Sequence, residues 1–216
     1  VATLVSSFYG GILGVGEFTY NYGISSWFLN ALPYYIFITF FAIFLAKKIR
    51  KTNLFTIPDK LDSVYGKKVS IFGAVLVFLL VTPAPYVFML GLLTTLIFGI
   101  PLWISMIIIL LFSILFLYKG GLNANVKVNI FEFIIMFAGF AIIIPFCILN
   151  IGDFNYLVNN LPQNHLNITG GNSISYIIVW FFIGAWALVD PSFHQRCYSA
   201  KSEKTAVKGV LISLLF

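Results

Sequence analysis

The sequence predicts an all-α protein that is embedded in a membrane and crosses it several times. Two observations lead to this fold class. Of the 216 residues, 60% are hydrophobic and only 9% are charged, whereas a soluble domain carries about a quarter charged residues. The apolar residues also fall into stretches of the length that a membrane helix needs, roughly 20 residues.

Six apolar stretches each predict one membrane span: residues 2–20, 27–46, 69–97, 101–118, 128–150 and 174–194. A seventh span begins near residue 205. The chain starts at Val1 rather than at a methionine, and Phe216 stands within an apolar run. We therefore expect a single transmembrane bundle that is truncated at both ends.

The basic residues all fall on one side of this six-span arrangement. The thirteen Lys and Arg residues occupy the second and fourth connections and the segment from Arg196 onward, and the other connections contain none. The positive-inside rule makes the basic side cytoplasmic, which places the loop 47–68 and the segment after residue 196 in the cytoplasm. Insertion into the plasma (inner) membrane thus explains the net charge of +6 with the lipid bilayer, and not nucleic acid, as the partner.

Glycines crowd the first predicted span, at Gly10, Gly11, Gly14 and Gly16. Membrane helices use glycine for close packing, which is the interpretation that composition favours. The alternative is a broken helix whose carbonyls face a cavity and can hold a cation.

Two further local patterns concern helix ends. Thr56 can cap a helix and Pro58 suits its first turn, so a short cytoplasmic helix is predicted at about 57–66. Pro83 and Pro85 fall inside the third span and predict a kink there.

Ionisable residues in or beside the spans are candidates for gating or coupling, because a charge at the membrane centre is costly. Glu17 lies near the outer end of the first span and Glu132 near the inner end of the fifth. Asp190 precedes Pro191 at the inner end of the sixth span, where Arg196 can pair with it if the segment bends. The alternative to a functional role for Glu17 and Glu132 is that their side chains simply reach the membrane interface. For Asp190 and Arg196, a structural latch is favoured over a cytoplasmic gate.

The sequence contains no enzymatic constellation. His165 belongs to an outer loop and His194 to an inner helix end, so they form no pair of metal ligands. A channel would need a pore-lining ring, and a membrane enzyme would need clustered His, Asp or Glu residues at one face. Neither pattern is visible.

Four motifs occur in an order and at a spacing similar to those of the sodium:solute symporter family. This family includes sodium/glucose, sodium/proline and sodium/pantothenate cotransporters. They extend over almost the whole chain: Gly14–Gly23 with Tyr20-Asn21-Tyr22-Gly23, Thr56-Ile57-Pro58-Asp59, Tyr118-Lys119-Gly120-Gly121-Leu122, and Gln195-Arg196 leading to Ala200-Lys201-Ser202. No single motif is diagnostic, but four in order on a matching charge map are specific.

The resemblance implies a leucine-transporter-like fold, with five helices followed by an inverted repeat of five. This chain would hold the first repeat and the first helix of the second. In such folds the solute sits between two broken helices, here spans one and six. By the same resemblance, backbone carbonyls of Leu4 and Ser7 bind sodium, Gly11 faces the solute and Trp186 is an aromatic gate.

The sequence also departs from the family pattern. Many members have a Thr-Asp pair where this chain has Val128-Asn129, so an acid along the proposed sodium exit path is absent. The residue that corresponds to the next Gln is Glu132. Gly11 has no side chain to bind a sugar hydroxyl, which argues against a sugar as the solute.

The expected function is therefore sodium-coupled symport of a small organic solute by alternating access, with sodium as the coupling ion and no other cofactor. Coupling to protons is the alternative within the same fold. A channel and a membrane-embedded enzyme are less favoured. Amino acids, carboxylates and vitamins all remain compatible as solutes.

Overall fold

The computed structural model describes residues 1–52, 54–118 and 121–216, and within these ranges every regular element is helical. Lys119 and Gly120, at the centre of the third family motif, lie outside the described residues. The elements are α1 (Ala2–Phe8), η1 (Tyr9–Gly11), α2 (Ile12–Tyr22), η2 (Trp27–Ala31), α3 (Leu32–Phe40), η3 (Phe41–Ala46), α4 (Lys47–Lys51), α5 (Ile57–Tyr65), α6 (Lys67–Leu80), α7 (Ala84–Phe98), α8 (Leu102–Tyr118), α9 (Gly121–Ile151), α10 (Phe154–Asn160), α11 (Ile174–Ile183), η4 (Gly184–Leu188), α12 (Pro191–Tyr198) and α13 (Glu203–Ser213).

Four stretches of helix in the described part of the chain are long and apolar enough to cross a membrane: Trp27–Lys51, Lys67–Phe98, Ala124–Ile151 and Ile174–Tyr198. The two other predicted spans correspond to the interrupted segment α1–η1–α2 and to the shorter helix α8. This helical, apolar architecture is that of an integral multi-pass membrane protein.

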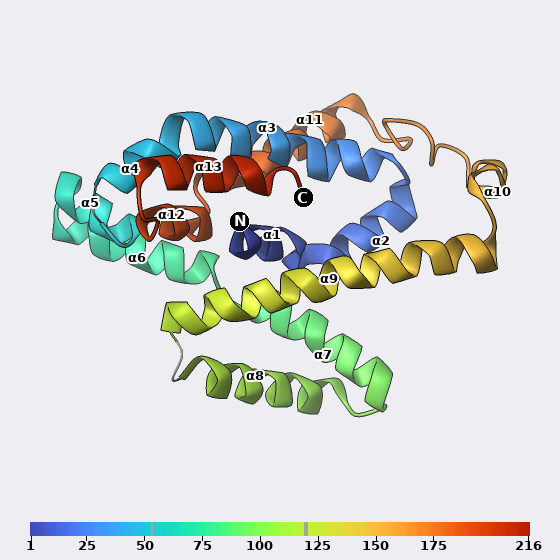
Figure 1. The fold of residues 1–216 in the computed structure, drawn as a ribbon, viewed down its shortest axis with the longest axis horizontal. Helices are drawn as coiled ribbons and strands as arrows, with labels where there is room; N and C mark the ends of the chain where they lie inside the picture. Colours follow the sequence, from blue (N-terminus) through green and yellow to red (C-terminus); the bar gives the residue numbers. More distant parts are fainter. Residues whose placement is uncertain (53, 119–120) are drawn as a thin grey trace.

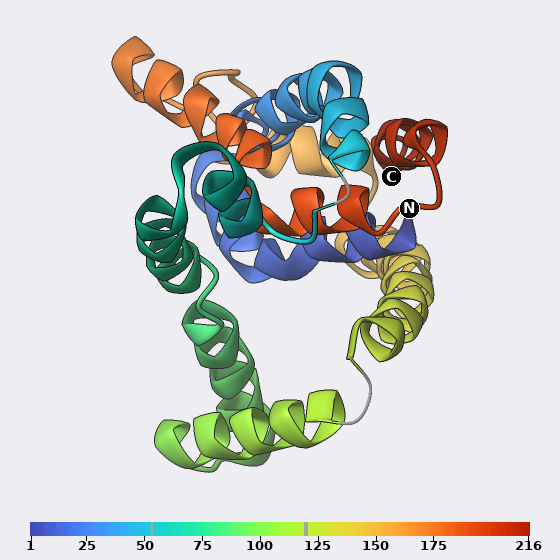
Figure 2. The ribbon, with the colours of Figure 1, turned by 90° about the vertical axis from the view of Figure 1, so that its left-hand side faces the viewer.

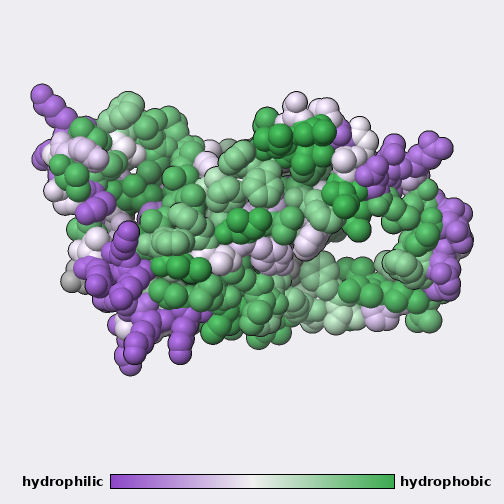
Figure 3. Space-filling view, turned by 90° about the horizontal axis from the view of Figure 1, so that it is seen from above, coloured by the Kyte–Doolittle hydropathy of each residue, from purple (hydrophilic) through white to green (hydrophobic). Residues whose placement is uncertain are grey.

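The helices run between two polar ends. In Figure 1, α4, α5, α12 and the beginnings of α6, α9 and α13 lie at one end, and α10 lies at the other. Figure 3 shows hydrophilic surface gathered at these ends and hydrophobic surface between them. An apolar belt between polar ends matches a bilayer, in which lipid covers side chains that water would not tolerate.

Three of the predicted spans are interrupted. In the first, the α-helix ends at Phe8 and a 3₁₀ turn, η1, leads into α2. The first span is thus interrupted at its glycines, as in the alternative of a broken helix, while one of these glycines, Gly10, also packs against Tyr86. The third span is interrupted between Leu80 and Ala84, beside the predicted kink at Pro83. The sixth passes through a 3₁₀ segment, η4.

A short helix, α5, follows the second span. The Thr56 side chain accepts the N–H of Asp59, and the Asp59 carboxylate accepts the N–H of Thr56 at 2.8 Å, which completes a capping box. Two donors that helix formation would leave unpaired are thus satisfied reciprocally.

The buried core lies where α1, the second span, the end of the sixth span and α13 meet (Figure 1). Its members are Leu4, Ile38, Phe41, Ala42, Ala46, Ile49, Ala187, Phe193, Cys197, Tyr198, Ala206 and Val210. By contrast, the α7–α8 hairpin projects from this body (Figure 2) and is joined internally by a 3.1 Å hydrogen bond between Thr95 and Ser105. The core therefore packs α1, at the start of the first span, against α12, at the end of the sixth.

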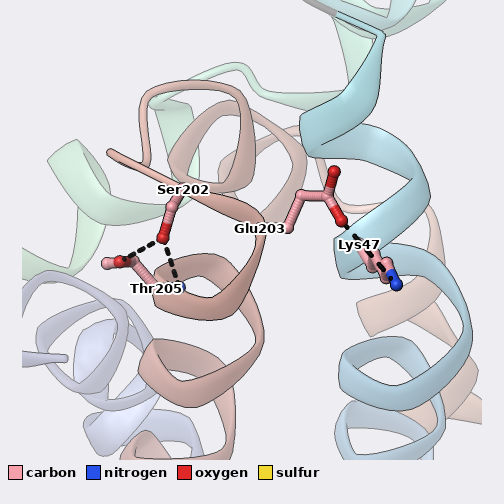
Figure 4. Close-up of polar contacts among 4 residues, drawn as sticks. All are labelled: Lys47, Ser202, Glu203 and Thr205. Carbon is pink, nitrogen blue, oxygen red and sulfur yellow. Dashed lines mark hydrogen bonds and ion pairs between the residues drawn. The ribbon is translucent and has the colours of Figure 1, made fainter.

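The first turn of α13 lies beside α4. Lys47 Nζ lies 3.8 Å from Glu203 Oε2, and the Ser202 hydroxyl caps the helix by accepting the N–H of Thr205 at 3.1 Å (Figure 4). Because both charged side chains are partly exposed, the ion pair contributes little stability, and the apolar contact of α13 with η3 and α4 holds the two spans together.

Candidate functional site

The break in the first span exposes the end of α1 as a source of backbone oxygens. The carbonyls of the last turn of an α-helix have no partner within that helix, and α1 ends at Phe8, where the tighter 3₁₀ turn η1 takes over. Ser7 lies in this last turn. Leu4 stands earlier in α1, with its side chain in the core at 3% exposure. Partial negative charge at a helix C-terminus favours a cation there.

The break in the sixth span is organised by Asp190. Its carboxylate accepts the N–H of Ser192 at 2.8 Å and so caps α12. At the end of the preceding element, η4, the Leu188 carbonyl accepts a hydrogen bond from His194 Nε2 at 2.9 Å. On the other flank, Gly184 packs so closely on α3 that an added Cβ would come within 2.6 Å of the Pro33 side chain.

The two broken helices contact each other directly through α1 and α12. Arg196 Nη2 donates to the Ser7 hydroxyl at 2.7 Å, and its Nη1 donates to the Ser192 carbonyl at 3.0 Å. Phe8 stacks on Phe193 with ring centroids 5.7 Å apart. In the described residues Arg196 thus bridges to the first span and forms no ion pair with Asp190.

A polar cluster on α9 adjoins α1. The Ser6 hydroxyl donates to the Asn129 carbonyl at 2.8 Å, and Asn129 is only 8% exposed. In the amide orientation that its neighbours favour, the Asn129 side chain donates to Glu132 Oε2 and to Asn125 Oδ1, each at 3.2 Å. The structure therefore brings Asn129 and Glu132 together and ties both to the broken helix.

Two open cavities border the interrupted helices. The inner cavity, of about 640 Å³, lies between α1, α9, α12 and α13, and Asn129, Arg196 and Lys208 are among its lining residues. The aromatic cavity, of about 580 Å³, is lined by Trp186 and Tyr34, together with Phe182, Ile183, Ala185 and Val189. The inner cavity has the volume of a small-molecule site, roughly 300–1,000 Å³, whereas the aromatic one is a shallow, open depression.

Two candidates lie apart from these contacts. Gly11, at the end of η1, has open space where a side chain would project, whereas its neighbour Gly10 has Tyr86 at 3.1 Å from such a position. Glu17 is exposed on α2, beyond the interruption at η1. The structure does not bring Glu17 into the cluster around Ser7 and Arg196.

Sequence reasoning missed several residues at this site. Ser6, Asn125 and His194 carry hydrogen bonds that join or end the broken segments. Tyr34, on α3, lines the aromatic cavity. Each comes from a different element, and no local sequence pattern distinguishes them from other polar residues.

Two broken helices that meet within an apolar bundle, beside a cavity of small-molecule size, are typical of secondary transporters. The comparison with protein-family models agrees. The model of the sodium:solute symporter family matches residues 2–216, and the chain belongs to this family. It is accordingly a membrane protein of sodium-coupled solute transport, and the family is one of transporters rather than enzymes. Searches of curated proteins and of solved structures gave no match.

Proposed function

We propose that this chain forms the sodium-binding part, and one wall of the solute site, of a symporter that works by alternating access. The observation that carries the proposal is the pair of interrupted helices, α1–η1–α2 and α11–η4–α12, joined at their inner halves by the Arg196–Ser7 hydrogen bond. Discontinuous helices supply both ion-binding carbonyls and movable halves in transporters of this kind.

Sodium binds at the end of α1 through the backbone carbonyls of Ser7 and Leu4, and later helices complete its shell. Ser7 lies in the last turn of α1, where carbonyls lack helical partners. The bound ion orders α1 against those later helices, and this differential binding shifts the population of the transporter toward the outward-open state.

The solute lies between the two breaks. Gly11 offers open space at the end of η1, and Trp186 lines the aromatic cavity beside η4. Trp186 acts as an aromatic gate, and the absence of a side chain at Gly11 leaves room for the solute and disfavours a sugar.

The fold we propose is leucine-transporter-like. The first inverted repeat runs from α1 to α9, and the sixth span opens the second repeat. The basic end of the molecule, with the loop 47–68 and the segment after residue 196, is cytoplasmic, and the membrane is the plasma (inner) membrane. In this orientation Arg196 and Ser7 close the inner cavity toward the cytoplasm, and Asp190 keeps α12 in place.

The driving force is sufficient for uphill uptake. One charge that moves down the membrane potential gains about 2.3 kcal/mol per 100 mV. Tenfold accumulation of a neutral solute requires about 1.4 kcal/mol. One sodium ion per solute therefore supports strong accumulation.

Uptake by the complete protein in proteoliposomes, at a clamped membrane potential, tests the proposal. We expect uptake to require a sodium gradient. Ser7→Pro removes a backbone donor and distorts the end of α1, so we expect it to abolish uptake and sodium binding while membrane insertion persists. Ser7→Ala is the matched control for the backbone, because it keeps the carbonyl and should still bind sodium, although it loses the bond to Arg196. Normal uptake by Ser7→Pro would contradict the placement of the ion site.

Proton coupling is the second candidate, and the Asn129–Glu132 contact favours it. Glu132 provides a carboxylate beside the inner cavity that could carry a proton. A pH gradient at constant sodium separates the two mechanisms. If a proton gradient alone drives uptake, and Glu132→Gln abolishes that uptake, the coupling ion is the proton and not sodium.

A further inference from the structure

The segment 47–68, which we term the basic elbow, concentrates positive charge at one end of the molecule. It comprises α4, α5, their connection and the start of α6, all at the end of the molecule where α12 and the beginning of α13 also lie (Figure 1). Seven of the thirteen basic residues belong to it, against two acidic ones. The basic side chains are Lys47, Lys48, Arg50, Lys51, Lys60, Lys67 and Lys68.

The outer part of the basic elbow is a fixed hairpin. Helix α5 turns back on α6 through Gly66, whose φ of 83° suits glycine. The Ser70 hydroxyl donates to the Pro58 carbonyl at 2.9 Å, and the Leu61 side chain lies against Gly73. Together with the capping box at Thr56, these contacts hold α5 at a set angle to the third span.

Large apolar side chains stand uncovered beside the lysines. Phe55 is 79% exposed, Tyr65 is 68% exposed, and Val64 is also exposed. Lys67 and Lys68 begin the helix that continues into the apolar third span, so they lie where a membrane-crossing helix enters the bilayer. Aromatic residues are enriched at this depth, since their rings suit the headgroup region.

We propose that the basic elbow binds anionic phospholipid headgroups of the adjacent leaflet, with Phe55, Val64 and Tyr65 inserted among them. The lysines complement the negative charge, and the apolar side chains gain a non-aqueous surrounding. Each basic side chain near an anionic membrane surface strengthens binding roughly fivefold.

A lipid headgroup accounts for this surface better than a soluble anion does. A dissolved phosphate ion would use the lysines and leave Phe55 and Tyr65 in water. A phospholipid contacts both kinds of side chain at once, because its charge and its acyl chains lie on either side of the interface at which Lys67 stands. The combination of apolar and basic side chains therefore favours a phospholipid over a dissolved anion.

Lipid retention by the complete protein tests this inference independently of transport. The protein is extracted from nanodiscs of phosphatidylcholine with a minor share of phosphatidylglycerol, and bound lipids are counted by native mass spectrometry. The triple variant Lys60→Gln/Lys67→Gln/Lys68→Gln should lose bound phosphatidylglycerol, with affinity lowered roughly a hundredfold. The matched control is Lys127→Gln/Lys201→Gln/Lys204→Gln, which removes the same charge from exposed positions outside the elbow and should retain the lipid.

A second variant probes the apolar contribution while leaving the charge unchanged. Phe55→Ser/Tyr65→Ser should also weaken phosphatidylglycerol retention, and monodisperse elution in size-exclusion chromatography verifies that each variant is folded. Equal lipid loss in the elbow and control variants, or no loss in either, would overturn the proposal. Displacement of the lipid by inorganic phosphate would identify a site for free anions instead.

Discussion

Replacement of Arg196 provides the most direct test of how the inner cavity is closed. Arg196 donates a 2.7 Å hydrogen bond to Ser7 and a 3.0 Å bond to Ser192. The bond to Ser192 stays within α12. Of the two hydrogen bonds, the one to Ser7 therefore links the sixth span to span one. Arg196→Gln removes this link and leaves the stacking of Phe8 on Phe193 in place.

The expected size of the effect follows from that one bond. A hydrogen bond to a charged group contributes about 1.5–3 kcal/mol. Because the Ser7 side of this contact is exposed, we take the lower end, which corresponds to a shift of about tenfold in the ratio of inner-open to inner-closed protein. Ser7→Ala should produce a similar shift, since it removes the same link from the other side.

Cysteine labelling measures this ratio. Val210 lines the inner cavity and is only 2% exposed, so Val210→Cys in a cysteine-free background reports its opening. In inside-out vesicles without sodium, an impermeant maleimide should label this cysteine about tenfold faster when Arg196 is replaced. Lys201→Gln is the charge-matched control and should leave the rate unchanged. An unchanged rate in Arg196→Gln, or an equal rise in the control, would refute the reasoning.

Three further outcomes are expected. Gly184→Ala should destabilise the protein by about 1–3 kcal/mol in thermal unfolding, because its Cβ would meet α3, whereas Gly139→Ala, with nothing within 4 Å, should not; equal melting temperatures would contradict the close packing. Ser6→Ala should cost about 1 kcal/mol through loss of its bond to the Asn129 carbonyl, also seen as a lower melting temperature. Trp186→Ala should raise the KM for the solute while sodium binding persists, and an unchanged KM would argue against the aromatic gate.

Much of the fold was predictable because the solvent imposes it. In lipid, backbone groups must be paired within each segment, so long apolar stretches become helices. Helix ends that depend on local chemistry were predictable as well. Thr56 and Asp59 form the capping box of α5, and the third span is interrupted beside Pro83.

The candidate site was only partly predictable, because its contacts join residues that are distant in sequence. Asp190 and Arg196 were recognised as a polar pair at the end of the sixth span. In the structure, Asp190 caps α12 and Arg196 reaches Ser7, 189 positions away. Local sequence gives no means of choosing between these partners.

The sequence by itself determined the membrane, the helical class, the basic end and the family, since hydropathy, charge and motif order are properties of the linear chain. Tertiary structure alone decided where the first span breaks, that α1 packs on α12 at the end of the sixth span, and that Asn129 lies buried between Ser6 and Glu132. The physical reason is that a helix breaks where the contacts made by its two halves outweigh the regular hydrogen bonds it gives up. Those contacts come from other helices, which the local pattern does not contain.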